Sequence, residues 1–528
     1  MNPVEFSRRT ALAGAAAAAA SGMAPTAFAQ ARRGGVLVVG LDPEPLALAS
    51  AGSIDAGASQ ISPKLFDRLF NQDLDGRPVP QLALSAQVSH DGLGVRINLR
   101  PGVKWHDGQP LTSADVAYSI AEVWTRLNAR LQLAFANLAG VDTPAPLVAL
   151  IRFSRPAPYI FSALADGGAQ VVPRHIYGGK DVLSNPNNRA PIGSGPFIFE
   201  SWERGGHIVL RRNPNYWDAP RPYLDKVIFR LISAGAPTVA ALETGEVQYV
   251  GQQGVPLSEV ERIRANKNLW VYNRSPSFLA SFAGLAFNVE RPVLRDVRVR
   301  QAFAHAIDKA FLLKNVWLGH GALADSPISP GSPFHAAGLP QYPLDLKRSE
   351  ALLDAAGFPR KADGVRLTLH NDIMPPSQLN ALAAEFIRSS LAKVGVRLEL
   401  RREELGTYLR RVFTTRDFDV ETYGTAADFD PALGIQRFYW SKSIQIGVPY
   451  TNPTHYASPQ ADRLLEAAQV ELDPARRREL YFEIQRLVQQ DLPLIPILFP
   501  DELAFGSRRL NHPFSSRVDN LADASLVA

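Results

Sequence analysis

The sequence predicts an α/β protein, and three observations support this fold class. Short strand patterns alternate with helical patterns along the chain, which is typical of α/β architecture. Hydrophobic residues make up 46% of the 528 residues and charged residues 20%, as in an ordinary globular protein. No stretch after Gln30 approaches the length of a membrane-spanning apolar helix. At about 150 residues per domain, the chain has room for roughly three domains or lobes.

The first half of the chain predicts strands, a capped helix and a hairpin. Residues 36–41 form an apolar run that ends in Asp-Pro, and residues 95–99 alternate between apolar and polar side chains. Thr112 followed by Asp115 is the pattern of a capping box at the start of a helix. Further along, the sequence predicts a hairpin of residues 197–202 and 208–212, and then a strand at 227–232.

The second half predicts longer helices between apolar strands. Apolar positions follow helical spacing from Asp296 to Trp317, and a later helix starts at Asp345 and ends at Gly357. The remaining predicted helices cover residues 380–394, 460–471 and 474–490, and the remaining predicted strands cover residues 396–400, 418–423 and 494–499.

The N-terminus has the pattern of an export signal. Arg8 and Arg9 precede a run of small apolar residues from Ala11 to Ala24, and Ala27-Phe28-Ala29 fits a signal-peptidase site. Paired arginines before a mildly apolar segment indicate the twin-arginine route. The mature chain is therefore expected to begin at Gln30 and to lie in the periplasm.

Composition and motifs argue against several classes of function. The chain has no cysteine, which excludes disulfides, thiolate metal sites and a cysteine nucleophile. The net charge of +5 is small and no long basic block is present, so nucleic acid is not an expected partner. The sequence contains no H-E-x-x-H zinc motif, no P-loop and no nucleophile elbow. His106, inside a Trp-His-Asp-Gly turn, is interpreted as a structural turn residue.

Several blocks resemble one family of receptors. They begin with L-R-P-G-V-K-W-H-D-G at residues 99–108 and L-T-S-A-D-V at 111–116. They continue with G-S-G-P-F at 193–197, R-N-P-N-Y-W at 212–217 and D-V-R-V-R-Q-A-F at 296–303. The order and spacing closely resemble the family-5 extracellular solute-binding proteins, which are the dipeptide, oligopeptide and nickel receptors of ABC importers.

The resemblance implies a two-lobed periplasmic binding protein of the type II, large cluster C form, with an extra domain. Ligand is then expected between the lobes, and closure around it shifts the population toward the closed form. The implied division is a signal peptide at 1–29, a discontinuous lobe I at 30–60, 187–280 and 495–528, an extra domain at 61–186, and lobe II at 281–494.

The resemblance also suggests where a ligand binds. Peptide receptors of this family hold the ligand ammonium on an aspartate in a loop after a strand, and Asp428 best matches that position. A buried carboxylate requires a cationic partner, which a ligand ammonium provides. The alternative is that Asp428 is solvated and that Asp430 caps the helix after Pro431.

Five further residues are candidate ligand contacts. Tyr423, Tyr439 and Trp440 are large rigid side chains of the kind that line ligand clefts, with core packing as the alternative. Phe282 starts a strand where the family often lines its pocket. Asn371 is expected just after a strand at residues 365–369, where a turn role is the alternative. Arg410, Arg411 and Arg437 are nearby, but none is singled out as a carboxylate ligand.

The expected function is that of a non-enzymatic receptor that captures a small solute and delivers it to an inner-membrane ABC permease. A short peptide is the favoured ligand, and the protein is expected to be monomeric and to need no cofactor. The alternatives are a non-peptide solute such as a metal chelate, an opine or a sugar, or an enzymatic or sensory use of the same cleft.

Overall fold

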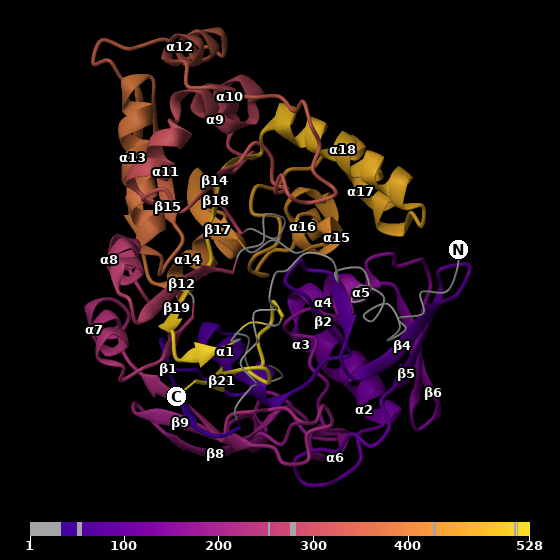
Figure 1. Ribbon diagram of the computed structural model, residues 1–528. Coiled ribbons are helices and arrows are strands. Elements are labelled where there is room, and N and C mark those ends of the chain that lie inside the picture. Colours follow the sequence, from indigo (N-terminus) through magenta and orange to yellow (C-terminus); the bar gives the residue numbers. More distant parts are fainter. Residues whose placement is uncertain are drawn as a thin grey trace, which may run out of the picture. The chain divides into compact units, whose positions relative to one another are not determined.

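The computed structural model describes residues 33–49, 55–251, 254–274, 281–425, 429–511, 514 and 516–527. The chain divides into two compact units, and it passes between them twice (Figure 1). Unit 1 comprises Met1–Tyr272 and Ala504–Ala528, and unit 2 comprises Asn273–Leu503. Both units combine helices with sheets, which confirms the predicted α/β class. The predicted signal peptide at 1–29 lies outside the described residues.

The main sheet of unit 1 has seven strands. β1 pairs in parallel with β10 and β11, while β8, β9 and β10 form antiparallel pairs. β8 and β9 are the predicted hairpin. The strands, in their order across the sheet, are β12 (Leu269–Asn273), β19 (Leu503–Ser507), β11 (Tyr249–Val250), β1 (Val36–Leu41), β10 (Lys226–Leu231), β9 (His207–Arg212) and β8 (Phe197–Glu203).

A second, four-stranded antiparallel sheet in unit 1 consists of β4 (Ala83–Val88), β5 (Gly94–Leu99), β7 (Val148–Phe153) and β6 (Leu138–Ala145), in that order. The predicted capping box is present at the start of α2 (Ser113–Tyr118), where the Asp115 carboxylate accepts from the Thr112 backbone N–H. The helix continues as a π-helical segment at Ser119–Trp124, and Ile120 and Trp124 of its apolar face are buried.

The remaining elements of unit 1 are short. The helices are α1 (Ala56–Leu65), α3 (Thr125–Leu127), α4 (Ala129–Ala134), α5 (Ile160–Leu164), α6 (Arg174–Tyr177), α7 (Ala236–Thr244) and α8 (Val260–Ala265), with 3₁₀ turns at Pro186–Asn188 and Leu257–Glu259. Two further strand pairs are β2 (Phe70–Gln72) with β3 (Pro78–Pro80), and β20 (Leu510–Asn511) with β21 (Ser525–Leu526).

The turn that contains His106 holds distant parts of unit 1 together. His106 Nδ1 accepts from the Gly193 N–H at 3.1 Å, and its Nε2 lies 3.1 Å from the Gly195 carbonyl oxygen. Burial lowers the pKa of His106 to about 4, so the ring is neutral. A Cβ on Gly193 would lie 1.8 Å from the Leu65 carbonyl oxygen, so this close backbone approach requires glycine. The predicted structural role of His106 is confirmed.

Unit 2 is built on a six-stranded mixed sheet. β15 runs parallel to both β16 and β17, while β13 runs antiparallel to β17 and β18. The strands, in their order across the sheet, are β14 (Gly321–Leu323), β18 (Leu494–Pro500), β13 (Phe282–Phe287), β17 (Val420–Thr425), β15 (Leu367–Ile373) and β16 (Val396–Arg402). Because β18 pairs with β13 and β14, residues 494–500 lie in unit 2, whereas the sequence analysis assigns residues from 495 onwards to lobe I.

The predicted helix at residues 296–317 is two helices. Asp308 interrupts it, because its carboxylate accepts from the Phe311 N–H and starts a new helix. The next helix has Asp345 as its N-cap and is followed by Gly357 at φ +89°, as predicted. The helices are α9 (Pro292–Arg295), α10 (Val297–Ala306), α11 (Lys309–Asn315), α12 (Leu346–Ala355), α13 (Gln378–Lys393), α14 (Leu405–Leu409), α15 (Pro431–Gly434), α16 (Gln436–Tyr439), α17 (Pro459–Val470) and α18 (Pro474–Asp491).

Two other features complete unit 2. A π-helical segment at Arg410–Thr415 follows α14, and a 3₁₀ turn at Ser441–Ser443 follows α16. Helix α13 packs against β15, β16 and β17. Within the residues that the structure describes, no helix of either unit is both long enough and apolar enough to span a bilayer.

Candidate functional site

Four of the predicted ligand contacts gather in one buried aromatic cluster of unit 2. Phe282 on β13 and Tyr423 on β17 lie on the same face of the sheet, with ring centroids 6.0 Å apart and nearly perpendicular rings. Tyr439 on α16 is also buried, and its ring lies 6.3 Å from that of Tyr456. The half-buried Trp440 packs against the cluster and donates from Nε1 to Glu466.

The other two predicted contacts fall elsewhere. Asp428 lies outside the described residues. Asn371 lies inside β15 rather than after a strand, because the ladder with β16 continues to Ile373. Its buried amide bonds the Thr422 hydroxyl, which lies 2.9 Å from Nδ2. Successive side chains of a strand point to opposite faces, so Thr422 is on the face opposite to Tyr423.

A small pocket, here called the Glu421 pocket, opens beside the aromatic cluster. Its volume is about 20 Å³. The lining runs from Tyr450, whose side chain is 42% exposed, to Glu421, which is 1% exposed. The complete lining is Met374, Tyr408, Phe413, Glu421, Tyr423, Gly424, Phe438, Tyr450, Thr451 and Pro453. All of these residues belong to unit 2.

Glu421 is a buried carboxylate on β17. Tyr408 Oη donates to its Oε2 at 2.5 Å, and no ion pair joins Glu421 to a cation in the described part of the chain. Arg416 lowers the pKa of Glu421 through its charge, but its guanidinium is hydrogen-bonded to Asn288 and Glu290. Burial outweighs these effects and raises the pKa of Glu421 to about 7.

Two more polar groups surround Glu421. The Tyr423 hydroxyl is buried and has no hydrogen-bond partner within the described residues. Asp372 is the register partner of Glu421 on β15, so the two carboxylates share one face of the sheet. Burial raises the pKa of Asp372 to about 7, against the opposite effect of Arg401 and Arg411, whose nitrogens approach it only to 3.7 and 3.5 Å.

Glu421, Asp372 and Tyr408 are not among the residues predicted from the sequence. The local sequence gives no signal for the burial of Glu421, because Phe418-Asp419-Val420-Glu421 alternates apolar and acidic residues, which is typical of a strand with one solvated face. Nothing in the local sequence indicates that Asp372 and Tyr408 join it, since they lie on other elements.

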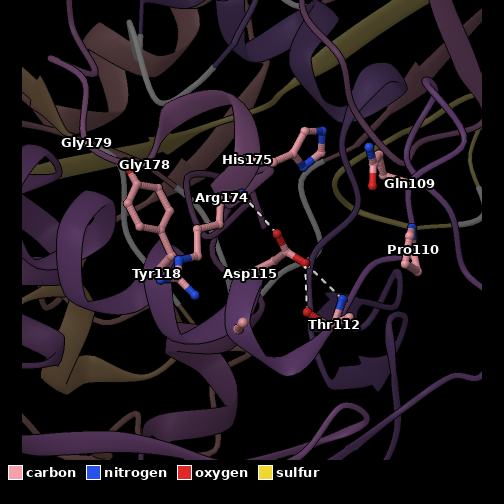
Figure 2. A pocket seen from close by; sticks show the side chains of 10 residues that line it. Gln109, Pro110, Thr112, Asp115, Tyr118, Arg174, His175, Gly178 and Gly179 are labelled. Carbon is pink, nitrogen blue, oxygen red and sulfur yellow. Dashed lines mark hydrogen bonds between the residues drawn. The ribbon is translucent and has the colours of Figure 1, made fainter.

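A larger surface pocket of about 640 Å³ lies in unit 1, next to α2 and α6. Figure 2 shows the Asp115 carboxylate at its centre, bonded on one side to Thr112 and on the other to the Arg174 backbone. His175 Nε2 lies 2.8 Å from Asp107 Oδ2. Because Asp115 and His175 are engaged in capping and pairing, these side chains hold the local fold together.

Comparison with known proteins decides the family. The model of the bacterial extracellular solute-binding proteins, family 5 Middle, matches residues 77–447. The chain belongs to this family. Members of this family are binding proteins.

Individual relatives cover nearly the whole chain. The oligopeptide-binding protein AppA of Bacillus subtilis is 25% identical over 485 residues, which are 89% of this chain and 87% of AppA. The glutathione-binding protein GsiB of Salmonella typhimurium is 27% identical over 476 residues, or 86% of this chain and 87% of GsiB. The structure of B. subtilis AppA in complex with a nonapeptide superposes on this chain with a TM-score of 0.81 and 24% sequence identity. The match covers 94% of this chain and 100% of the AppA chain. The two-lobed α/β fold of the family is therefore the fold of this chain.

Proposed function

We propose that this protein is the exported substrate receptor of an ABC importer and that its solute is a short peptide. The observation that carries this proposal is the family match across residues 77–447. Relatives named for oligopeptide and glutathione binding support a peptide as the ligand class. The receptor would capture its solute outside the inner membrane and deliver it to the permease subunits, working as a monomer.

The Glu421 pocket supports a binding role over a catalytic one. Its described lining contains no Ser, Cys, His or Lys. Aromatic walls with a few polar groups are typical of ligand sites. We therefore propose that the protein acts without catalysis, and that Tyr423 and Phe282 support the bound solute.

The proposed location follows from the N-terminal pattern. Arg8 and Arg9 before an Ala-rich segment support export by the twin-arginine route, with cleavage after Ala29. The mature receptor would then begin at Gln30 in the periplasm.

A thermal-shift screen of the mature chain tests the proposed function. The panel contains peptides of two to nine residues, glutathione, nickel–histidine complexes, opines and sugars. A solute that binds only the folded state raises the melting temperature, by an amount that grows with its concentration over Kd. We expect peptides to give the largest increases, and calorimetric titration then measures their affinity. A panel in which only chelates, opines or sugars stabilise the protein would replace the peptide assignment with that solute class.

A further inference from the structure

We propose that the Glu421 pocket binds a primary ammonium group of the solute. The inference rests on the proposed function, since it names the chemical group that the receptor recognises. This site lies on strand β17 and is separate from the ammonium site that the family resemblance implies at Asp428.

The charge balance around Glu421 favours a bound cation. A carboxylate taken out of water is costly unless a cation or several hydrogen bonds compensate it. Glu421 is 1% exposed, and Tyr408 Oη is its hydrogen-bond donor among the described residues. Asp372 lies beside it in register and raises the pKa of Glu421 through its charge, while Arg401 and Arg411 approach Asp372 to 3.7 and 3.5 Å. A bound ammonium would supply the missing positive charge.

The hydrogen-bonding groups and the size of the pocket fit an ammonium group. An ammonium group carries N–H donors only, and so it requires acceptors. Glu421 offers carboxylate lone pairs, and the buried Tyr423 hydroxyl has no partner in the described part of the chain. A volume of about 20 Å³ is close to that needed by one water-sized group. An ammonium is of that size, whereas a guanidinium or a quaternary ammonium is too large.

Aromatic side chains form the wall of the pocket. Phe413 and Tyr450 have ring centroids 5.9 Å apart, and Tyr423 and Phe438 have centroids 6.4 Å apart. All four residues line the pocket. Faces of aromatic rings attract cations, most strongly where water is excluded. The ring of Tyr450 is held at the exposed end of the pocket on a left-handed backbone with φ of 62°, a strained conformation for a non-glycine residue.

The groups that face Glu421 also predict how binding depends on pH. They are Asp372 on β15, Tyr408 on α14, Tyr423 on β17 and Arg416 after the π-helical segment. Since the pKa of Glu421 is raised to about 7, its carboxyl group is mostly protonated at pH 6 and mostly ionised at pH 8. A proton and an ammonium therefore compete for Glu421, and ammonium binding should strengthen between these two pH values.

The experiment uses the smallest probe of the group, methylammonium, with tetramethylammonium as a matched cation that is too large. Melting curves of the full mature chain are recorded at pH 8 at equal concentrations of either chloride salt. At pH 8 we expect methylammonium to raise the melting temperature of the wild type more than tetramethylammonium does. At pH 6 we expect this difference between the two cations to be smaller. Glu421→Gln should abolish the difference. The matched control Glu399→Gln, an exposed carboxyl on β16, should keep it.

Tyr423→Phe provides a second variant in case Glu421→Gln folds poorly. Its lost hydroxyl makes no hydrogen bond in the described structure, so a purely structural role predicts an unchanged melting temperature with and without probe. We expect the unliganded melting temperature to stay and the methylammonium effect to shrink. Equal stabilisation by both cations in the wild type would overturn the inference, as would full retention of the effect in both variants.

Peptides found by the screen separate this inference from the proposed function. Acetylation of the N-terminus, or of a lysine side chain, removes one ammonium at a time. We expect one of the two modifications to weaken binding to the wild type by at least about 30-fold, the lower limit for breaking a buried charge pair, and to have little effect on binding to Glu421→Gln, which distinguishes this pocket from Asp428. Peptides that bind equally well in both acetylated forms would overturn the ammonium site but leave the peptide receptor standing. If methylammonium stabilises the protein but no peptide binds, the ammonium site stands and the peptide assignment is overturned.

Discussion

Removing one partner of the buried ion pair between Asp430 and Arg477 should strongly destabilise unit 2. Two parallel hydrogen bonds of 2.7 Å join Arg477 Nη1 and Nη2 to the two carboxylate oxygens, and both side chains are 6% exposed. Asp430 also caps α15 by accepting from the Ala432 N–H. Asp430→Asn keeps a good capping residue and removes the charge, so it isolates the ion pair.

The expected loss follows from this burial. Removing one partner of a buried pair leaves the other charge uncompensated and costs about 3–5 kcal/mol. At roughly 2–4 °C per kcal/mol for a domain of this size, the melting temperature should fall by roughly 6–20 °C. A double variant, Asp430→Leu with Arg477→Met, should recover most of this loss, because apolar pairs often replace buried ion pairs at little cost.

Urea unfolding and melting curves measure these effects. The matched control is Asp473→Asn, because Asp473 caps α18 in the same way by accepting from the Arg476 N–H but is exposed and has no ion pair in the described structure. We expect this control to change the free energy of unfolding by less than about 0.5 kcal/mol. If Asp430→Asn is no more destabilising than Asp473→Asn, the assumed cost of an uncompensated Arg477 is wrong.

Three further predictions concern the binding loop, pH and export. Asp428→Ala should weaken binding of a screened peptide by roughly 30- to 3,000-fold in calorimetric titrations if this residue holds a buried ammonium, while unchanged affinity would remove it from the site. The pKa of Glu421 is raised to about 7 in the folded protein, so its contribution to stability is present at low pH and is lost as pH rises from about 4.5 to about 7. In urea titrations, Glu421→Gln should therefore gain stability relative to the wild type between pH 5 and pH 8. A difference in stability that stays constant with pH would contradict the raised pKa. Replacing Arg8 and Arg9 by Lys should stop appearance of the cleaved protein in periplasmic fractions, and normal export would exclude the twin-arginine route.

Helix ends and strand periods were predictable because they depend on neighbouring residues. The Thr112 capping box, the helix from Asp345 to Gly357 and the hairpin of β8 and β9 all match the sequence patterns. In each case a capping side chain, a left-handed glycine or an alternating run acts within a few residues. The family resemblance was visible for a related reason, since turns and caps keep their residue types at regular spacing.

Contacts between distant residues decided the rest. Asn371 was misplaced, since the strand ladder between β15 and β16 continues past it to Ile373. The burial of Glu421 depends on β15, α14 and the residues around Tyr450, none of which is adjacent to it in sequence. Likewise, Arg477 reaches Asp430 across 47 residues. The sequence by itself therefore determined the elements and the family, whereas only the tertiary structure decided which carboxylate is paired and which is left for a cation, because burial and charge compensation depend on the whole fold.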